Sequence, residues 1–254
     1  MNKSSYLSMQ KVKIMRHSGR KNNELRELTI QKDFIDTAFS SVLISFGGTR
    51  VICTATVEDS VPRFLKDSGQ GWITAEYSML PASSSDRIRR EVTKGKQSGR
   101  TMEIQRLIGR SLRAAVDMEA LGERSIMIDC DVIQADGGTR TTSITGGMIV
   151  LYDAIQKLMS QGKLDVNPVR NFVSAISVGL VDGDVLLDLD YKEDSSADVD
   201  MNLVMTDDGR FIEIQGTAEQ TPFDSNHLTD FLEVGKAGID TIISRSKELL
   251  MVSV

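Results

Sequence analysis

The sequence predicts an α+β fold in which two related halves each combine a sheet with covering helices. Apolar patterning gives the order strands, helix, strand, helix, strands, helix along the chain. A weak internal repeat relates residues 41–58 to residues 199–219. Each segment contains a glycine turn followed by an apolar strand, and the two end in T-A-T-V-E and G-T-A-E. A length of 254 residues, 40% of them hydrophobic, suffices for one large domain or two small ones. We expect a single domain over residues 16–254.

The first half follows residues 1–15, a polar and unpatterned stretch that we interpret as a disordered N-terminal extension. Apolar runs then predict strands, and Gly, Pro and Ser mark the connections. The predicted elements are a first strand with its connection over 24–39, a hairpin over 41–57, a strand over 72–80 closed by Pro81, a mobile basic loop over 82–99, and a helix over 101–121. Arg106, Arg110 and Arg113 share the polar side of that helix, which favours a solvated face or a subunit contact.

At the centre of the chain, an alternating apolar run over 125–133 predicts a buried strand. A polar junction over 134–147 leads from this strand into an amphipathic helix. The elements expected after it are a strand over 171–180, a tight turn over 181–184, a return strand over 185–191, a hairpin formed by 198–205 and 210–215, and one or two closing helices over 227–250.

Composition excludes several classes of protein. No apolar run approaches the roughly 18 residues of a membrane span, and the basic N-terminus lacks the apolar core of a secretory signal. Cys53 and Cys130 lie inside apolar runs and are interpreted as buried small hydrophobes. His17 and His227 are the only histidines and have no cysteine neighbours, which argues against zinc sites and Ser-His-Asp chemistry. We therefore expect a soluble cytoplasmic protein that does not enter a membrane.

The charge distribution modifies what the net charge suggests. A net charge of −6 argues against nucleic-acid binding. However, residues 85–100 contain six cations and only two anions, whereas residues 182–200 are strongly acidic. Separate basic and acidic patches can hold a phosphate chain on one and a metal ion on the other.

The junction over 134–147, Q-A-D-G-G-T-R-T-T-S-I-T-G-G, has the composition of an anion site. Gly137 and Gly138 allow the backbone to approach a ligand closely. The groups on offer suit phosphate best: the hydroxyls of Thr139, Thr141, Thr142 and Ser143, the guanidinium of Arg140, and the free N–H groups of the following helix. The tetrapeptide G-G-T-R alone is weak evidence, because it also occurs at 47–50, where a hairpin connection explains it.

Carboxylates gather between Asp188 and Asp200. Asp188 and Asp190 alternate on one strand face, as surface charges do. Asp194 and Asp200 border ordered apolar elements, where a carboxylate can be held rigidly. These two could share a divalent ion, or one could have a raised pKa and donate a proton. From the residues alone, plain surface charge is an equally good interpretation.

Four longer motifs carry a resemblance that covers the chain from about Arg16 to about Leu250. They are G-Q-G-W-I-T-A-E-Y at 69–77, G-R-T-M-E-I-Q-R-L-I-G-R at 99–110, D-C-D-V-I-Q-A-D-G-G-T-R-T at 129–141 and E-D-S-S-A-D-V-D-M-N at 193–202. With these motifs the sequence closely resembles the bacterial ribonuclease PH family. The resemblance implies the ribonuclease PH fold, with two βαβα-like halves whose mixed sheets are covered by helices.

The same resemblance implies an activity. Members of this family remove nucleotides from RNA 3′ ends with inorganic phosphate and release nucleoside diphosphates, and they work in reverse as nucleotidyltransferases. The implied substrates are tRNA precursors, with ribosomal RNA as a further candidate. The implied assembly is a cytoplasmic homohexamer built as a trimer of dimers.

The resemblance also assigns roles to individual residues. Phosphate binding falls to Arg100, Gly138, Thr139 and Arg140. Catalysis falls to Arg100, Asp194 and Asp200, where the two aspartates hold Mg²⁺, or Mn²⁺ as the alternative, and Asp194 is the preferred proton donor to the leaving group. RNA binding falls to Arg87 and Arg90. These assignments require that residues 100, 140, 194 and 200 converge on one pocket.

One departure from the family pattern is visible, and two alternative functions stay open. Ala82 stands where many relatives have arginine, and three serines follow it, which concerns the strength of RNA binding and not the chemistry. The alternatives are an RNA-binding scaffold without activity and a hydrolytic metal nuclease. Inactive relatives typically lack the arginine or the aspartates, all of which are present here.

Overall fold

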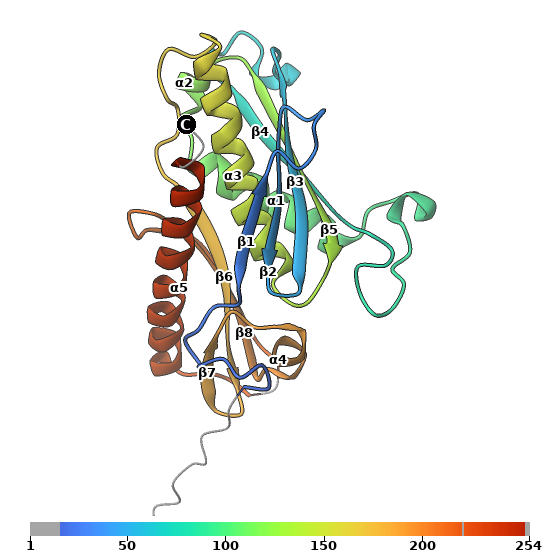
Figure 1. Ribbon diagram of the computed structural model, residues 1–254, viewed down its shortest axis with the longest axis vertical. Coiled ribbons are helices and arrows are strands. Elements are labelled where there is room, and N and C mark those ends of the chain that lie inside the picture. The colour runs from blue at the N-terminus through green and yellow to red at the C-terminus, as the bar shows by residue number, and fades with distance from the viewer. Residues whose placement is uncertain (1–15, 220, 252–254) are drawn as a thin grey trace, which may run out of the picture.

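Two sheets and the helices packed against them make up the fold (Figure 1). The computed structural model describes residues 16–219 and 221–251, so the extension expected over 1–15 lies outside the described residues. The first sheet has five strands in the order β1-β2-β3-β5-β4, and the second has four in the order β7-β6-β8-β9. The α+β prediction is confirmed, with one sheet in each half of the chain.

The first sheet is mixed, as expected. Strands β1, β2, β3 and β5 pair antiparallel with their neighbours, whereas β4 runs parallel to β5. The hairpin predicted around residues 47–50 is the β2–β3 connection. The elements of this half are β1 (Leu28–Lys32), β2 (Ser40–Phe46), β3 (Thr49–Glu58), β4 (Trp72–Met79), α1 (Gly99–Ala114), α2 (Met118–Leu121) and β5 (Ser125–Gln134), with short 3₁₀ turns at Arg63–Leu65 and Glu91–Lys94.

The second sheet is antiparallel throughout, so the expectation of a mixed sheet is wrong for this half. The reason is local: tight turns join β6 to β7 and β8 to β9, and a tight turn can only join antiparallel strands. The return strand expected over 185–191 stops at Leu187, and a short helix replaces its end. The elements are β6 (Val173–Val181), β7 (Asp184–Leu187), α4 (Tyr191–Ser196), β8 (Val199–Thr206), β9 (Phe211–Ala218) and α5 (Ser225–Met251).

Helix α3 (Thr139–Ser160) connects the two halves and is shared by them. It packs on β2, β3 and β5 of the first sheet and on β6 of the second. The predicted amphipathic pattern is therefore wrong, because most of its side chains are buried whichever way they point. A Cβ at Gly146 would lie 2.6 Å from the Cys53 sulfur, so the missing side chain lets the helix approach the sheet closely.

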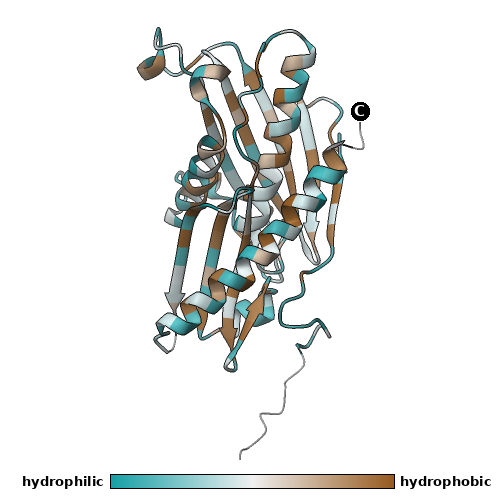
Figure 2. Ribbon diagram, turned by 90° about the vertical axis from the view of Figure 1, so that its left-hand side faces the viewer, coloured by the Kyte–Doolittle hydropathy of each residue, from teal (hydrophilic) through white to brown (hydrophobic). Residues whose placement is uncertain are grey.

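The remaining helices cover the outer parts of the two sheets. α1 packs on β4 and on α3, and α5 packs on β6, β7 and β8. Along α5 hydrophobic and hydrophilic segments alternate, as expected for a helix with one buried side (Figure 2). The helix predicted over 101–121 is two helices, α1 and α2, because the chain leaves the helical path at Ala115. No helix within the described ranges combines the length and apolarity needed to cross a bilayer.

Two smaller expectations can be compared with the structure. Cys53 and Cys130 are buried free thiols on neighbouring strands, as predicted, with their sulfur atoms 3.7 Å apart. The arginine stripe on α1 is only partly a solvated face. Arg106 is exposed, but Arg113 stacks over Trp72 at 4.6 Å and donates to the Ile73 carbonyl, and Arg110 forms a 2.7 Å ion pair with Glu213 of β9. Arg110 and Arg113 thus hold parts of one chain together.

Candidate active site

The loop between β5 and α3 makes a tight turn at two glycines. Gly137 and Gly138 have φ angles of 73° and 64°, in the left-handed region that L side chains rarely adopt. A Cβ at Gly137 would lie 2.6 Å from the Leu189 carbonyl oxygen, so this loop is pressed against the segment that leads into α4. We call residues 136–140 the glycine loop. It brings the N-terminus of α3 against the second half of the chain.

The other copy of G-G-T-R supports the glycine loop. The Thr49 hydroxyl donates to the Gly137 carbonyl at 2.6 Å and accepts from the Asp136 backbone N–H at 2.8 Å. A Cβ at Gly48 would lie 2.5 Å from the Asp136 carboxylate, so the hairpin turn touches the loop directly. The first tetrapeptide is a hairpin turn, as predicted, and it also positions the second.

Arg26 also supports the glycine loop, on the side that faces the second half of the chain. Its guanidinium donates to the Asp136 carbonyl and forms an ion pair with Asp188, with 2.7 Å between Nη2 and Oδ1. Arg26 is buried, so the charge is removed from water and depends on these partners. The loop is therefore fixed by the β2–β3 turn on one side and by a buried ion pair to the second half on the other.

Most of the hydroxyl run does not face a ligand, contrary to the prediction. Thr141 and Thr142 both donate to the Gly138 carbonyl, and Ser143 donates to the Thr139 carbonyl. These hydroxyls satisfy the first turns of α3, because Ser and Thr within a helix readily bond to carbonyls of the preceding turn. Thr139 alone keeps its expected place, where its Oγ1 accepts a 2.9 Å hydrogen bond from the buried Tyr77 phenol.

A cavity of about 390 Å³ lies between the glycine loop and the second sheet. The four residues expected to converge, Arg100, Arg140, Asp194 and Asp200, all line it. They come from α1, α3, α4 and β8, four elements that are distant in sequence. The lining residues are Met79, Ser84, Ser85, Asp86, Arg100, Ala135, Asp136, Gly137, Gly138, Thr139, Arg140, Ser177, Tyr191, Asp194, Asp200 and Asn202.

The two arginines of the cavity are held differently. Arg140 is mostly buried and donates to the Gln215 side chain at 2.6 Å, with Glu103 3.8 Å away. Arg100 lies in the first turn of α1, whose N-cap Ser98 accepts from the Thr101 backbone N–H. Its side chain is exposed and forms no ion pair with any residue that the structure describes. One guanidinium is thus fixed in place and the other is available to an anion.

The two aspartates form the opposite charge in the cavity. Burial and the neighbouring Asp194 raise the pKa of Asp200 to about 6, against an ordinary value of 3.8. Burial also raises the pKa of Asp194, and the positive charges of Arg100 and Arg140 act against that rise. Oδ1 of Asp200 is buried, and no described residue donates a hydrogen bond to it. A buried, unsatisfied carboxylate oxygen is costly unless a proton or a cation reaches it.

Comparison with known families identifies the chain. Residues 24–155 match the model of the 3′ exoribonuclease family, domain 1, and residues 171–238 match the model of the same family, domain 2. The chain belongs to the 3′ exoribonuclease family. The first match ends within α3 and the second begins just before β6, so each contains one of the two sheets.

Solved structures share the fold of this 3′ exoribonuclease family member. An Archaeoglobus fulgidus exosome with RNA bound to the active site contains a chain that aligns with a TM-score of 0.77 and 19% identity, over 91% of this chain and 92% of that one. Rice (Oryza sativa) Rrp46 aligns with a TM-score of 0.74 and 17% identity, over 92% and 100%. An archaeal exosome core gives 0.72 and 19%, over 91% of each chain. At these identities the likeness shows the fold alone.

Asp188 and Asp190 are not the surface charges that the alternating strand pattern suggested. They are 1% and 5% exposed and take part in a buried ion cluster. Arg26 pairs with Asp188, Arg16 pairs with Glu193 at 2.5 Å, and His17 lies 3.0 Å from Asp190. His17, Asp190 and Glu193 lie close enough to hold a metal ion, but Arg16 and Arg20 already supply positive charge to these carboxylates. The cluster therefore ties the N-terminal segment to the second half.

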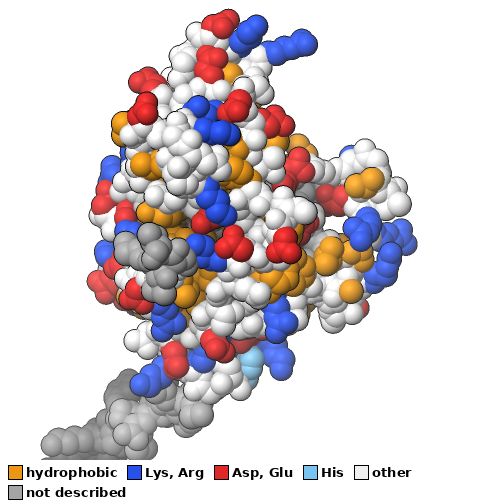
Figure 3. Space-filling view, turned by 45° about the horizontal axis from the view of Figure 1, so that its top comes forward, with side chains coloured by type: hydrophobic (Ala, Val, Ile, Leu, Met, Phe, Trp, Pro, Cys, Tyr) orange, Lys and Arg blue, Asp and Glu red, His pale blue; other side chains and the backbone are white. Residues whose placement is uncertain are grey.

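Arg87 and Arg90, the expected RNA-binding residues, do not line the cavity. Both are exposed on the segment between β4 and α1, which projects from the body of the molecule (Figure 1). Lys and Arg side chains gather on this projection, and they include Arg87, Arg89, Arg90 and Lys96 (Figure 3). Ser84, Ser85 and Asp86 of the same segment reach the cavity. The projection thus extends the site of this exoribonuclease family member with a basic surface.

Four residues that the sequence did not single out belong to the site. Thr49 and Arg26 support the glycine loop, Tyr77 orients Thr139, and Tyr191 lines the cavity. The repeat of G-G-T-R was a usable signal for Thr49, although a hairpin explained it fully. Nothing in the sequence near Arg26, Tyr77 or Tyr191 indicates which distant residue each of them meets.

Proposed function

We propose that this protein is a phosphorolytic 3′-to-5′ exoribonuclease that trims RNA, releases nucleoside diphosphates, and runs in reverse as a nucleotidyltransferase. Membership of the 3′ exoribonuclease family supports the substrate class. The observation that carries the phosphorolytic reading is the cavity in which Arg100, Thr139 and Arg140 lie together with Asp194 and Asp200. Cationic groups on one side suit an incoming phosphate, and carboxylates on the other suit a departing oxygen.

The charges in the cavity support the proposed reaction. Inorganic phosphate attacks the phosphorus of the terminal phosphodiester, the bond to the 3′ oxygen of the preceding nucleotide breaks, and the products are a nucleoside diphosphate and a shortened RNA. Two anions have to approach each other, so the guanidinium groups of Arg100 and Arg140 offset their repulsion. Asp194 donates a proton to the departing 3′ oxygen, and burial of this carboxyl favours the protonated form.

Asp194 and Asp200 would also hold Mg²⁺, or Mn²⁺ in its place. The fit rests on the donor set: two neighbouring carboxylates, one of which has a buried oxygen that no described residue satisfies. Oxygen ligands of this kind suit a hard divalent cation. When bound, Mg²⁺ supplies positive charge that neutralises the scissile phosphate.

The proposed substrates are the 3′ ends of tRNA precursors, with ribosomal RNA as a further candidate. Arg87 and Arg90 would hold the RNA outside the cavity, because their exposed cations suit the phosphate backbone. The proposed assembly is a cytoplasmic homohexamer built as a trimer of dimers.

The test is an incubation with a 3′-extended RNA and Mg²⁺, with and without inorganic phosphate. We expect nucleoside diphosphates only when phosphate is present. Nucleoside monophosphates in both reactions would instead identify a hydrolytic nuclease, and RNA binding without any product would identify a scaffold.

Arg100→Ala tests the assignment of the phosphate site. Loss of one preorganised donor to the reacting phosphate should lower the rate by roughly 10²- to 10³-fold. Arg106→Ala is the matched control, because Arg106 is exposed on the same helix and does not line the cavity. Phosphate-dependent trimming at the wild-type rate by the Arg100 variant would contradict the assignment.

A further inference from the structure

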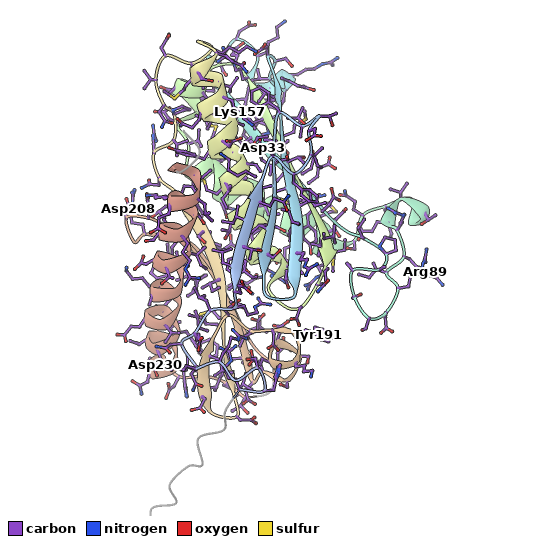
Figure 4. The ribbon with its side chains drawn as sticks, viewed as in Figure 1. Asp33, Arg89, Lys157, Tyr191, Asp208 and Asp230 are labelled. Carbon is purple, nitrogen blue, oxygen red and sulfur yellow. The ribbon has the colours of Figure 1, made fainter. Side chains whose placement is uncertain are left out.

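Tyr191 is an exposed aromatic residue at the wall of the cavity. The residue is 61% exposed, although burial of a tyrosine ring usually stabilises a protein. Among the described residues that line the cavity, it is the only aromatic one. Figure 4 shows Tyr191, the first residue of α4, near the end of the first sheet that lies closest to the second half. An exposed ring at the wall of a charged cavity is a surface on which a ligand can stack.

The backbone of Tyr191 is fixed by both halves of the site. Its N–H donates to the Asp136 carboxylate of the glycine loop at 3.3 Å. It is the first residue of α4, and a capping box formed by Asp190 and Glu193 stabilises this N-terminal end of the helix. A Cβ at Gly137 would lie 2.9 Å from the Tyr191 nitrogen, so the loop and the start of α4 approach each other closely.

The position of Tyr191 along α4 relates the ring to the proposed chemistry. Tyr191 and Asp194 are three residues apart, so they lie on neighbouring positions of one helix face, and both line the cavity. The base of the nucleotide being removed is covalently attached, through its ribose, to the phosphate that reacts near Asp194. The base therefore has to lie near this face of α4.

We propose that Tyr191 is a stacking surface for the 3′-terminal base of the RNA, an inference that rests on the proposed exoribonuclease function. An enzyme that removes successive nucleotides has to accept every base in turn. Stacking suits this requirement, since each base presents a π face and no hydrogen-bond pattern has to be matched. Tyr191 thus supplies affinity for the terminal nucleotide without selecting its identity, while the arginines bind the phosphates.

Kinetic measurements separate stacking from phosphate binding. Tyr191→Ala should raise KM for RNA by about 5- to 150-fold, the range expected for loss of one base–aromatic stack. KM for inorganic phosphate should stay unchanged, and Tyr191→Phe and Tyr191→Trp should retain wild-type KM for RNA. Phe34→Ala is the control for loss of an exposed aromatic ring, because Phe34 is 38% exposed and follows Asp33, which lies toward the other end of the first sheet (Figure 4).

A direct readout comes from an RNA that carries 2-aminopurine at its 3′ end, mixed with the protein in EDTA and without phosphate so that no chemistry occurs. Stacking on Tyr191 should quench the fluorescence of the terminal probe. We expect Tyr191→Ala to lose that quenching at saturating protein, with Tyr191→Phe and Phe34→Ala unaffected. A probe in the middle of the RNA should respond equally to all the proteins.

The outcomes of the two experiments distinguish this inference from the function on which it rests. Normal KM and normal terminal quenching in Tyr191→Ala would overturn the stacking assignment while phosphorolysis by the wild type stood. Quenching that depends on Tyr191 in a protein that releases no nucleoside diphosphate would support the stacking site and remove the proposed reaction.

Discussion

At the scale of single residues, Asp200 has the clearest physical signature in the site. Its carboxyl is mostly buried, one oxygen lacks a donor among the described residues, and its pKa is about 6. The folded state therefore binds a proton that the unfolded state has lost, in the pH range between 3.8 and about 6. Stability from this group is present at low pH and is lost as the pH rises through that range.

Asp200→Asn removes this penalty and should stabilise the protein at high pH. In EDTA at pH 8 we expect the variant to be more stable than the wild type by about 1–3 kcal/mol, after allowance for solvent screening. Near pH 4 the two proteins should have similar stability, because the wild-type carboxyl is then protonated. Urea denaturation at a series of pH values measures the difference, and a difference that does not change with pH would show that the carboxyl is not strained in the fold.

The sequence predicted individual site residues well where a motif carried them, and poorly where packing decides. Arg100, Thr139, Arg140, Asp194 and Asp200 were all expected, and all line one cavity. The neighbouring residues Thr141, Thr142 and Ser143 carry the same hydroxyl group as Thr139. Their hydroxyls bond to helix carbonyls instead, because each points along α3 and not out of its first turn.

At the scale of elements, the close approach of α3 to the first sheet depends on one glycine of a pair. A Cβ at Gly146 would meet the Cys53 sulfur at 2.6 Å and Ile44 at 2.8 Å, whereas a Cβ at Gly147 would meet its neighbours at an ordinary 3.4 Å. The two glycines are adjacent and both buried, so they form a natural matched pair.

Gly146→Ala and Gly147→Ala should therefore differ in sign. Gly146→Ala overpacks the core and should cost about 1–3 kcal/mol. Gly147→Ala gains helix propensity and should be neutral or stabilising by about 1 kcal/mol. Thermal unfolding followed by circular dichroism should show a lower Tm for the first variant only. Equal effects of the two substitutions would mean that helix propensity, and not the contact with Cys53, governs this position.

The elements themselves were predicted where periodicity and turn residues agree. The β2–β3 and β8–β9 hairpins are alternating runs around glycine turns, and their existence was correct. The short helix α4 was missed, because Asp190 was assigned to the return strand and its capping box with Glu193 was not foreseen. The character of α3 was missed as well, because a helix packed between two sheets has no free polar side to show in its sequence.

At the scale of the whole molecule, a buried ion cluster ties the N-terminal segment and the glycine loop to the second half. Arg26 bonds both to the loop carbonyls and to Asp188, and Arg16 pairs with Glu193. Breaking one member of a buried pair leaves an uncompensated charge, whereas removing both members can cost little. This cluster could not be predicted from the sequence, because each arginine lies more than 160 residues from the carboxylate it pairs with.

Arg26→Met and Asp188→Leu should therefore be strongly non-additive. Each single substitution should cost about 3–5 kcal/mol, and the double variant should lose clearly less than the two costs combined. Lys236→Ala is the control, because the exposed Lys236–Asp240 pair on α5 should contribute well under about 1 kcal/mol. Urea denaturation of the four proteins measures the coupling, and additive costs would show that the two side chains act independently.

Because α3 packs on both sheets, it resists a hinge motion that would separate the two walls of the cavity. The glycine loop lies at the N-terminal end of α3, and Asp200 lies on a strand of the second sheet. Helix α3 packs on both sheets and so connects these two parts of the cavity. On the proposed function, a single-stranded RNA end would then enter a cavity that is already formed. For the proposed function this means that the shape of the RNA end, and not a closing movement of the protein, would decide which ends are admitted.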